Sequence, residues 1–95
     1  MQESDHLSTI KVIFSTIYQY KMFKLFEKLP NDQSYYEVIK NPISISDIRE
    51  KVQENKYNSI DEFQNDFKIL YSNTQMFNGD KSLDTATSEI IYLII

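Results

Sequence analysis

Two places in the chain combine aromatic rings with polar groups that could contact a ligand. The first is the segment Tyr35–Pro42, with the sequence YYEVIKNP, and the second is Phe77-Asn78-Gly79. Asn78 carries a carboxamide that can donate a hydrogen bond to a carbonyl oxygen, and Tyr35 carries a phenol that can hold an ordered water. We predict that the two places meet in space and line one pocket.

Residue types needed for catalysis or metal binding are almost missing. The chain has no cysteine, and its single histidine, His6, lies near the N-terminus. A zinc site needs three or four ligands, so none is expected. No glycine-rich phosphate loop, nucleophile elbow or EF-hand loop occurs. We therefore predict no enzymatic activity, no catalytic residue, no metal and no cofactor.

Composition and charge narrow the class of partner. A chain of 95 residues is expected to form one small domain, and its single glycine and two prolines favour helices over a β-sandwich or barrel. The net charge of −4 disfavours direct binding to nucleic acid but suits a Lys/Arg-rich protein. No signal peptide is expected, and the longest apolar run, Ile90–Ile95, is too short to cross a bilayer.

Apolar spacing predicts four helices, over residues 4–21, 45–55, 59–77 and 83–95. We expect Ser4 or Asp5 to cap the first helix and the chain's end to truncate the last. The third helix has the clearest periodicity, at Ile60, Phe63, Phe67, Leu70, Thr74 and Phe77. On the fourth helix we expect the inward residues to be Ala86, Ile90, Leu93 and Ile94.

Capping signals mark where the middle helices begin and end. Ser44 followed by Asp47, and Ser59 followed by Glu62, have the spacing of capping boxes. Of the two, the Ser59 box is predicted to be the stronger. Gly79 can adopt a positive φ and is expected to end the third helix directly after Asn78.

The connections indicate how the helices pack. Residues 22–44 form a long loop that is too apolar to be disordered, and a loop of this length is more often functional than idle. Residues 78–82 form a short loop. One long and two short connections predict an all-α, antiparallel four-helix bundle.

The two polar places suit a neutral amide ligand held in an apolar shaft. Acetyl-lysine is such a ligand, because acetylation removes the lysine charge and leaves a carbonyl acceptor. Asn78 would donate to that carbonyl, and Tyr35 would hold a water that bridges to it. The shaft is predicted to consist of Phe26, Leu29, Val38, Ile43 and Phe77.

At these residues the chain resembles the bromodomain family, the acetyl-lysine readers of histone tails. The resemblance rests on YYEVIKNPISISDIREKV followed by NKYNSIDEFQNDFKILYSNTQMFN. FEKLP with YYEVIKNPIS is most similar to the polybromo and yeast chromatin-remodelling-complex subgroup. It implies a single domain over residues 1–95, folded as a left-handed bundle of helices Z, A, B and C with a long ZA loop and a short BC loop.

The resemblance also implies roles for individual residues. Asn78 takes the position of the acetyl-anchoring asparagine, Tyr35 that of the water-holding tyrosine and Phe26 that of the aromatic shelf. Phe77 stands where most members carry tyrosine. The gatekeeper at the start of the last helix is either Leu83 or Asp84, depending on how the loop before it is aligned.

By resemblance, the domain is monomeric and reads acetylated histone tails in the nucleus, as part of a chromatin-remodelling or transcription-regulating complex. The segment between Pro30 and Tyr35 is shorter than is usual in the family, and Asp84 could stand at the pocket mouth. These departures support an alternative, in which the domain has lost acetyl-lysine binding and acts as a protein-interaction scaffold.

Overall fold

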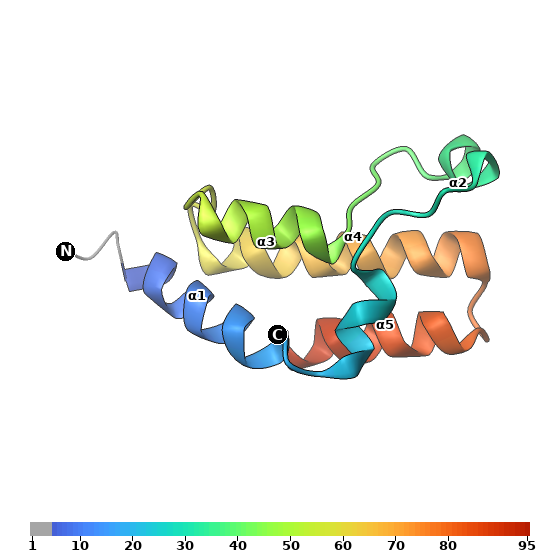
Figure 1. Ribbon diagram of the computed structural model, residues 1–95. Helices are drawn as coiled ribbons and strands as arrows, with labels where there is room; N and C mark the ends of the chain where they lie inside the picture. Colours follow the sequence, from blue (N-terminus) through green and yellow to red (C-terminus); the bar gives the residue numbers. More distant parts are fainter. Residues whose placement is uncertain (1–4) are drawn as a thin grey trace.

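The computed structural model describes residues 5–95, which form helices and loops with no strand among them (Figure 1). In chain order the helices are α1 (Asp5–Ile17), the 3₁₀ helix η2 (Lys21–Phe26), α2 (Gln33–Val38), α3 (Ile45–Gln53), α4 (Ile60–Asn78) and α5 (Leu83–Ile94). The fold is the predicted all-α four-helix bundle, formed by α1, α3, α4 and α5. The predicted helix start at Ser4 lies outside the described residues.

Aromatic side chains form the centre of the bundle. α4 packs along α5 and also contacts α1, whereas α3 packs against α1 and η2. The Phe63 and Phe67 side chains of α4 are fully buried, with ring centroids 5.2 Å apart in an edge-to-face arrangement. Phe23 of η2 meets Phe67 edge-to-face at 6.2 Å. The periodic apolar face of α4 therefore joins the core to the loop segment that contains Phe23.

The serine caps of α3 and α4 form where they were predicted, but their relative strength is the reverse of the expected one. At α3, Ser44 Oγ accepts from the Asp47 amide and Asp47 Oδ2 accepts from the Ser44 amide, which closes a complete capping box. At α4, Ser59 Oγ accepts from the Glu62 amide at 3.1 Å. Glu62 Oε1, however, accepts from the amide of Asn58 instead of Ser59. The prediction that Ser59 forms the stronger box is wrong, because the carboxylate reaches one residue further back.

The first helix ends at Ile17, before the predicted end at residue 21. The Tyr20 amide donates to the Ile17 carbonyl, and the chain then turns into η2. A continued α-helix could not place the crowded apolar residues from Met22 onward on one stripe. Because the chain turns into η2, Phe23 is fully buried although it does not lie on the apolar stripe of α1.

The predicted inward face of α5 is wrong. Its buried residues are Thr85, Ser88 and Ile91. The residues expected to point inward are exposed instead, namely Ala86, Ile90, Leu93 and Ile94. Small side chains at Thr85 and Ser88 let α5 approach its neighbours closely, and their hydroxyls donate to backbone carbonyls, so burying them leaves no polar group unpaired. None of the helices in residues 5–95 is long and apolar enough to cross a membrane.

The long first connection is held to the bundle at several points. The Ser46 amide donates to the Glu27 carbonyl at 3.0 Å, and the Asn73 side chain of α4 donates to the Asn41 carbonyl at 2.9 Å. In Figure 1 the connection extends beyond the bundle, where it forms α2, and then returns to α3. Both short helices, η2 and α2, lie within the segment that was expected to be loop.

Glu27, the residue directly after η2, anchors this connection electrostatically. Its carboxylate accepts hydrogen bonds from the Arg49 guanidinium of α3 and, at 2.8 Å, from the Tyr18 hydroxyl. Burial opposes ionisation of Glu27, but the bonds from Arg49 and Tyr18 outweigh it and hold the pKa of the carboxyl below its usual value of 4.5.

Acid is therefore expected to destabilise the fold in part through Glu27. Because its pKa is lower in the folded than in the unfolded chain, Glu27 contributes stability above pH 4.5. This contribution is lost as the pH falls through the folded-state pKa. Glu27→Gln should lower the unfolding free energy at neutral pH and reduce its fall toward about pH 3, measured by urea denaturation. An identical acid dependence in Glu27→Gln and in the exposed-residue control Glu50→Gln would contradict this assignment.

Candidate binding site

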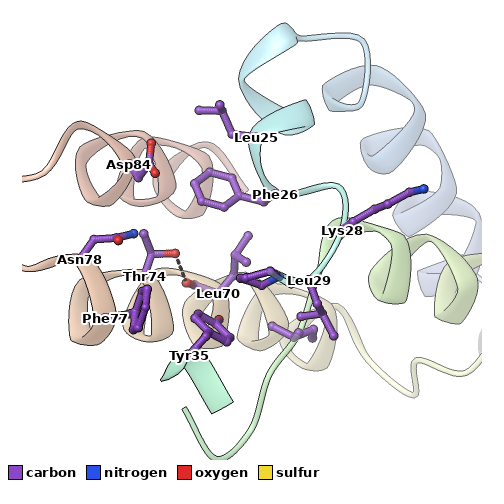
Figure 2. A pocket seen from close by; sticks show the side chains of 12 residues that line it. Leu25, Phe26, Lys28, Leu29, Tyr35, Leu70, Thr74, Phe77, Asn78 and Asp84 are labelled. Atoms are coloured by element: carbon purple, nitrogen blue, oxygen red, sulfur yellow. Dashed lines mark hydrogen bonds between the residues drawn. The ribbon is translucent and has the colours of Figure 1, made fainter. Parts of the chain in front are cut away.

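A cavity of about 190 Å³ opens where the long connection meets the end of α4 and the start of α5. Figure 2 shows its lining side chains, which come from η2, the loop after it, α2, α4 and α5. The lining residues are Leu25, Phe26, Lys28, Leu29, Pro30, Tyr35, Ile43, Leu70, Thr74, Phe77, Asn78 and Asp84. The volume is below the roughly 300–1,000 Å³ of pockets for drug-sized ligands, which suits a single side chain.

Most residues predicted to contact a ligand lie together in this cavity. They are Phe26, Leu29, Tyr35, Ile43, Phe77, Asn78 and Asp84. The structure thus joins the two places that the sequence separates, although contact of each residue with a ligand stays a prediction.

Val38 and Leu83 do not line the cavity. Tyr35 of α2 and Ile39, one turn later, are both buried. Val38 therefore points outward, and 43% of its surface is exposed. Leu83 begins α5 and is 79% exposed, because the phase of that helix directs Thr85 inward. Of the two gatekeeper candidates, Asp84 lines the cavity and Leu83 does not, and the gatekeeper role of Asp84 stays a prediction.

Asn78 is the last residue of α4 and stands at the rim. Gly79 follows with φ of 89°, a conformation that favours glycine, and its amide still donates to the Gln75 carbonyl at 2.8 Å. The helix therefore stops abruptly and exposes the Asn78 side chain. In Figure 2 the dashed hydrogen bond joins the Thr74 hydroxyl to the Leu70 backbone carbonyl. Within residues 5–95 the Asn78 carboxamide makes no hydrogen bond, so its donors are available to the cavity.

Tyr35 forms the opposite side of the cavity. Its ring packs edge-to-face against Phe77 with centroids 5.0 Å apart, and against Tyr36 at 5.3 Å. Only 7% of Tyr35 is exposed, and burial, together with the neighbouring Tyr36, raises the pKa of its phenol above the usual value of 10. The hydroxyl is therefore neutral at physiological pH and can both donate and accept.

Sequence reasoning missed several lining residues. Leu70 and Thr74 were assigned to the core face of α4, yet they lie eight and four residues before Asn78 and share its side of the helix. Counting back from Asn78 at helical spacing would have found both. Leu25, Lys28 and Pro30 carried no such signal, because the path of the chain through η2 and the loop after it is set by contacts with the bundle.

Two residues near Tyr35, Tyr36 and Ile39, hold the connection in different ways. Ile39 is buried, with 2% of its surface exposed. Tyr36 is exposed, and its hydroxyl donates at 2.7 Å to the carbonyl of Pro30. Tyr36 thus links two parts of the long connection to each other, and this hydrogen bond holds the segment that contains Tyr35 in place.

The lining has the chemistry of a site for a neutral polar ligand. Apolar walls surround one free carboxamide and one neutral phenol, a combination that can hold a neutral polar group at the end of an aliphatic stem. Among residues 5–95, no group of three or more His, Asp or Glu side chains could hold a metal ion. Two charged residues line the cavity, Lys28 and Asp84, and in Figure 2 the Lys28 amino group points away from the other side chains.

Comparison with known proteins gives consistent matches. A family model described as Bromodomain matches residues 8–89. The chain is 48% identical over 52 residues to chromatin structure-remodeling complex subunit RSC2 of Saccharomyces cerevisiae, covering 52% of this chain and 6% of that protein. It is 30% identical over 81 residues to chromatin structure-remodeling complex subunit rsc1 of Schizosaccharomyces pombe, covering 76% of this chain and 10% of that protein.

A third relative comes from a different type of complex. The chain is 40% identical over 55 residues to transcription initiation factor TFIID subunit 1 of Caenorhabditis elegans, covering 58% of this chain and 3% of that protein. In each case the match spans a tenth or less of the relative's own length. The predicted resemblance, including that to subunits of remodelling complexes, is confirmed. The chain belongs to the bromodomain family.

Proposed function

We propose that this domain binds acetylated lysine side chains in the cavity bounded by Asn78 and Tyr35. The observation that carries the proposal is the convergence of a free carboxamide and a neutral phenol on one small cavity with apolar walls. A bromodomain is a binding module and not itself a catalytic domain, which agrees with this chemistry.

The lining explains how an acetylated lysine would be distinguished from an unmodified one. The acetyl carbonyl would accept a hydrogen bond from the Asn78 carboxamide and, through a water held by Tyr35, a second one. The lysine methylenes would lie against Phe26, Leu29 and Ile43. An unmodified lysine would bring its ammonium group to the same place. There the group would lose its hydration without gaining an anionic partner inside the cavity, and burying an unpaired charge is costly.

The partner that fits best is an acetylated histone tail. The net charge of −4 favours approach of a Lys/Arg-rich segment. Two relatives are named as subunits of chromatin structure-remodeling complexes and one as a subunit of a transcription initiation factor. We infer that this chain forms one domain, over residues 1–95, of a nuclear protein in such a complex, and that the domain is monomeric without direct contact to nucleic acid or membrane.

One feature favours a second candidate function. Asp84 places an exposed carboxylate at the mouth of the cavity, where it disfavours an apolar ligand stem. A domain that had lost acetyl-lysine binding could still serve as a scaffold for other subunits. The convergence of Asn78, Tyr35 and Phe77 favours the reader function over the scaffold, because a scaffold needs no free carboxamide in a cavity.

Titration with matched peptides tests the proposal. Basic tail peptides with and without one acetyl-lysine would be titrated into the domain by calorimetry. We expect the acetylated peptide to bind with micromolar or weaker affinity, because one side chain in a small pocket makes few contacts, and the unmodified peptide to bind more weakly still. Equal affinity for both peptides, or no detectable binding, would leave the scaffold as the better explanation.

A further inference from the structure

Asp84 occupies a well-defined place at the cavity. It lies in the first turn of α5, whose start is fixed by Ser82, because the Ser82 hydroxyl accepts from the Thr85 amide at 3.0 Å. Thr85 Oγ1 donates at 2.6 Å to the Gly79 carbonyl, which ties α5 to the loop that follows Asn78. The position of Asp84 relative to Asn78 is therefore set by structure on both sides. In Figure 2 Asp84 and Asn78 project from neighbouring helix ends toward the same cavity.

The Asp84 carboxylate has no cationic partner on the described part of the chain. The ion pairs within residues 5–95 join Arg49 to Glu27, Lys51 to Asp66 and Lys56 to Glu54. Lys28 also lines the cavity, but its amino group points away from Asp84 in Figure 2. Because the other charged side chain of the lining points away from it, the exposed Asp84 carboxylate can interact with a charge that a ligand brings.

We propose that Asp84 makes the site selective for an acetyl-lysine that has an arginine or lysine within two residues of it. The inference rests on the proposed function and adds the sequence around the acetyl-lysine to it. When the neutral acetyl group fills the cavity, the peptide backbone crosses the mouth, where Asp84 lies. An extended chain advances about 3.3 Å per residue, so a long cationic side chain one or two positions away reaches the carboxylate.

The same geometry predicts which neighbours are disfavoured. Arginine should be best, because its guanidinium can engage a carboxylate with two parallel hydrogen bonds. A neighbouring glutamate would be repelled. A second acetyl-lysine in the neighbouring position lacks the positive charge, so a doubly acetylated peptide should lose the contribution of Asp84.

The solvent exposure of Asp84 limits how much a cationic neighbour can raise the affinity. Asp84 is exposed, and pairs between exposed charges contribute little. We expect about a two- to fivefold tighter affinity for an arginine neighbour than for a glutamine neighbour. Added salt should shrink this ratio, because exposed charges are screened.

The test compares peptides that carry one acetyl-lysine and differ only in whether arginine, glutamine or glutamate stands one or two residues before or after it. Each is titrated into the unmodified domain, Asp84→Asn and Asp80→Asn. The last is a matched control, since Asp80 lies on the loop before α5 and its carboxylate accepts from Gln75. Both variants change the net charge equally. We expect the arginine-to-glutamine affinity ratio to fall to about one only in Asp84→Asn.

Three outcomes would overturn the inference while leaving acetyl-lysine binding intact. The first is a ratio of one at all four positions in the unmodified domain. The second is an unchanged ratio in Asp84→Asn, and the third is an equal fall in Asp80→Asn, which would point to net charge. Unacetylated versions of the arginine peptides form the remaining arm. If they bind as tightly as the acetylated ones, the proposed function itself fails, and the selectivity inference with it.

Discussion

Replacing Asn78 by alanine is expected to weaken binding of an acetylated peptide by about 1–3 kcal/mol, a roughly 5- to 150-fold rise in Kd. In the proposed binding mode, the carboxamide donates the direct hydrogen bond to the acetyl carbonyl. Its removal leaves that carbonyl buried without a direct partner, which costs more than an exposed hydrogen bond is worth. Calorimetric titration of one acetylated peptide into both proteins measures the change.

Two further variants make this measurement specific. Asn65→Ala removes the same group from an exposed position on the same helix, outside the cavity, and should leave the Kd unchanged. Asn78→Asp keeps the shape but replaces the donor with an acceptor, so it should bind at least as poorly as Asn78→Ala. If Asn78→Ala binds like the unmodified domain, Asn78 has no part in recognition. A loss in both alanine variants would instead indicate damage to the fold.

Replacing Phe67 by alanine is expected to lower the free energy of unfolding by about 3–5 kcal/mol. The side chain is fully buried, with edge-to-face contacts to Phe63 within α4 and to Phe23 of η2. Its removal opens a cavity where the bundle meets the long connection. Because small domains unfold with only about 5–15 kcal/mol, the variant should unfold at a much lower urea concentration.

Ile60→Ala serves as the control for this prediction. It also shortens an apolar side chain on α4, but Ile60 is 39% exposed, so the change in unfolding free energy should be well below that of Phe67→Ala. Similar losses of unfolding free energy in the two variants would contradict the view that the Phe23–Phe63–Phe67 cluster contributes most to the stability of the core. Far-ultraviolet circular dichroism would check that both variants remain helical before denaturation.

Local sequence signals predicted the parts of the fold that depend on local rules. α4 follows from one apolar face repeated over many turns, and Gly79 ends it because the φ of 89° favours glycine. The capping box at Ser44 follows from two side chains three residues apart. The α4 pattern repeats over many turns, which makes it clear from sequence alone. The two caps involve residues three or four positions apart, so they can be inferred without knowing what packs against them.

The buried face of α5 could not be predicted from local sequence signals. Its second half, from Ile90 onward, is apolar on every side, so hydrophobicity alone cannot indicate which face is buried. The observed face is selected by Thr85 and Ser88, whose small size permits close packing. The sequence also left open whether Leu83 or Asp84 faces the cavity, because the loop before α5 can be aligned in two ways; the phase of α5 places Asp84 in the lining. Similarly, η2 and α2 are too short to be stable alone and form only against the bundle.

The anchoring of Glu27 has a consequence for affinity. Phe26 and Leu29, two walls of the cavity, lie on either side of Glu27 in the chain, and Glu27 is bound to Arg49 of α3. Holding these walls in place before a ligand arrives reduces the conformational entropy that binding must remove. If only part of the population has the walls in place, the apparent Kd rises in inverse proportion to that part. The strength of recognition at Asn78 is thus partly determined by an ion pair that never touches the ligand.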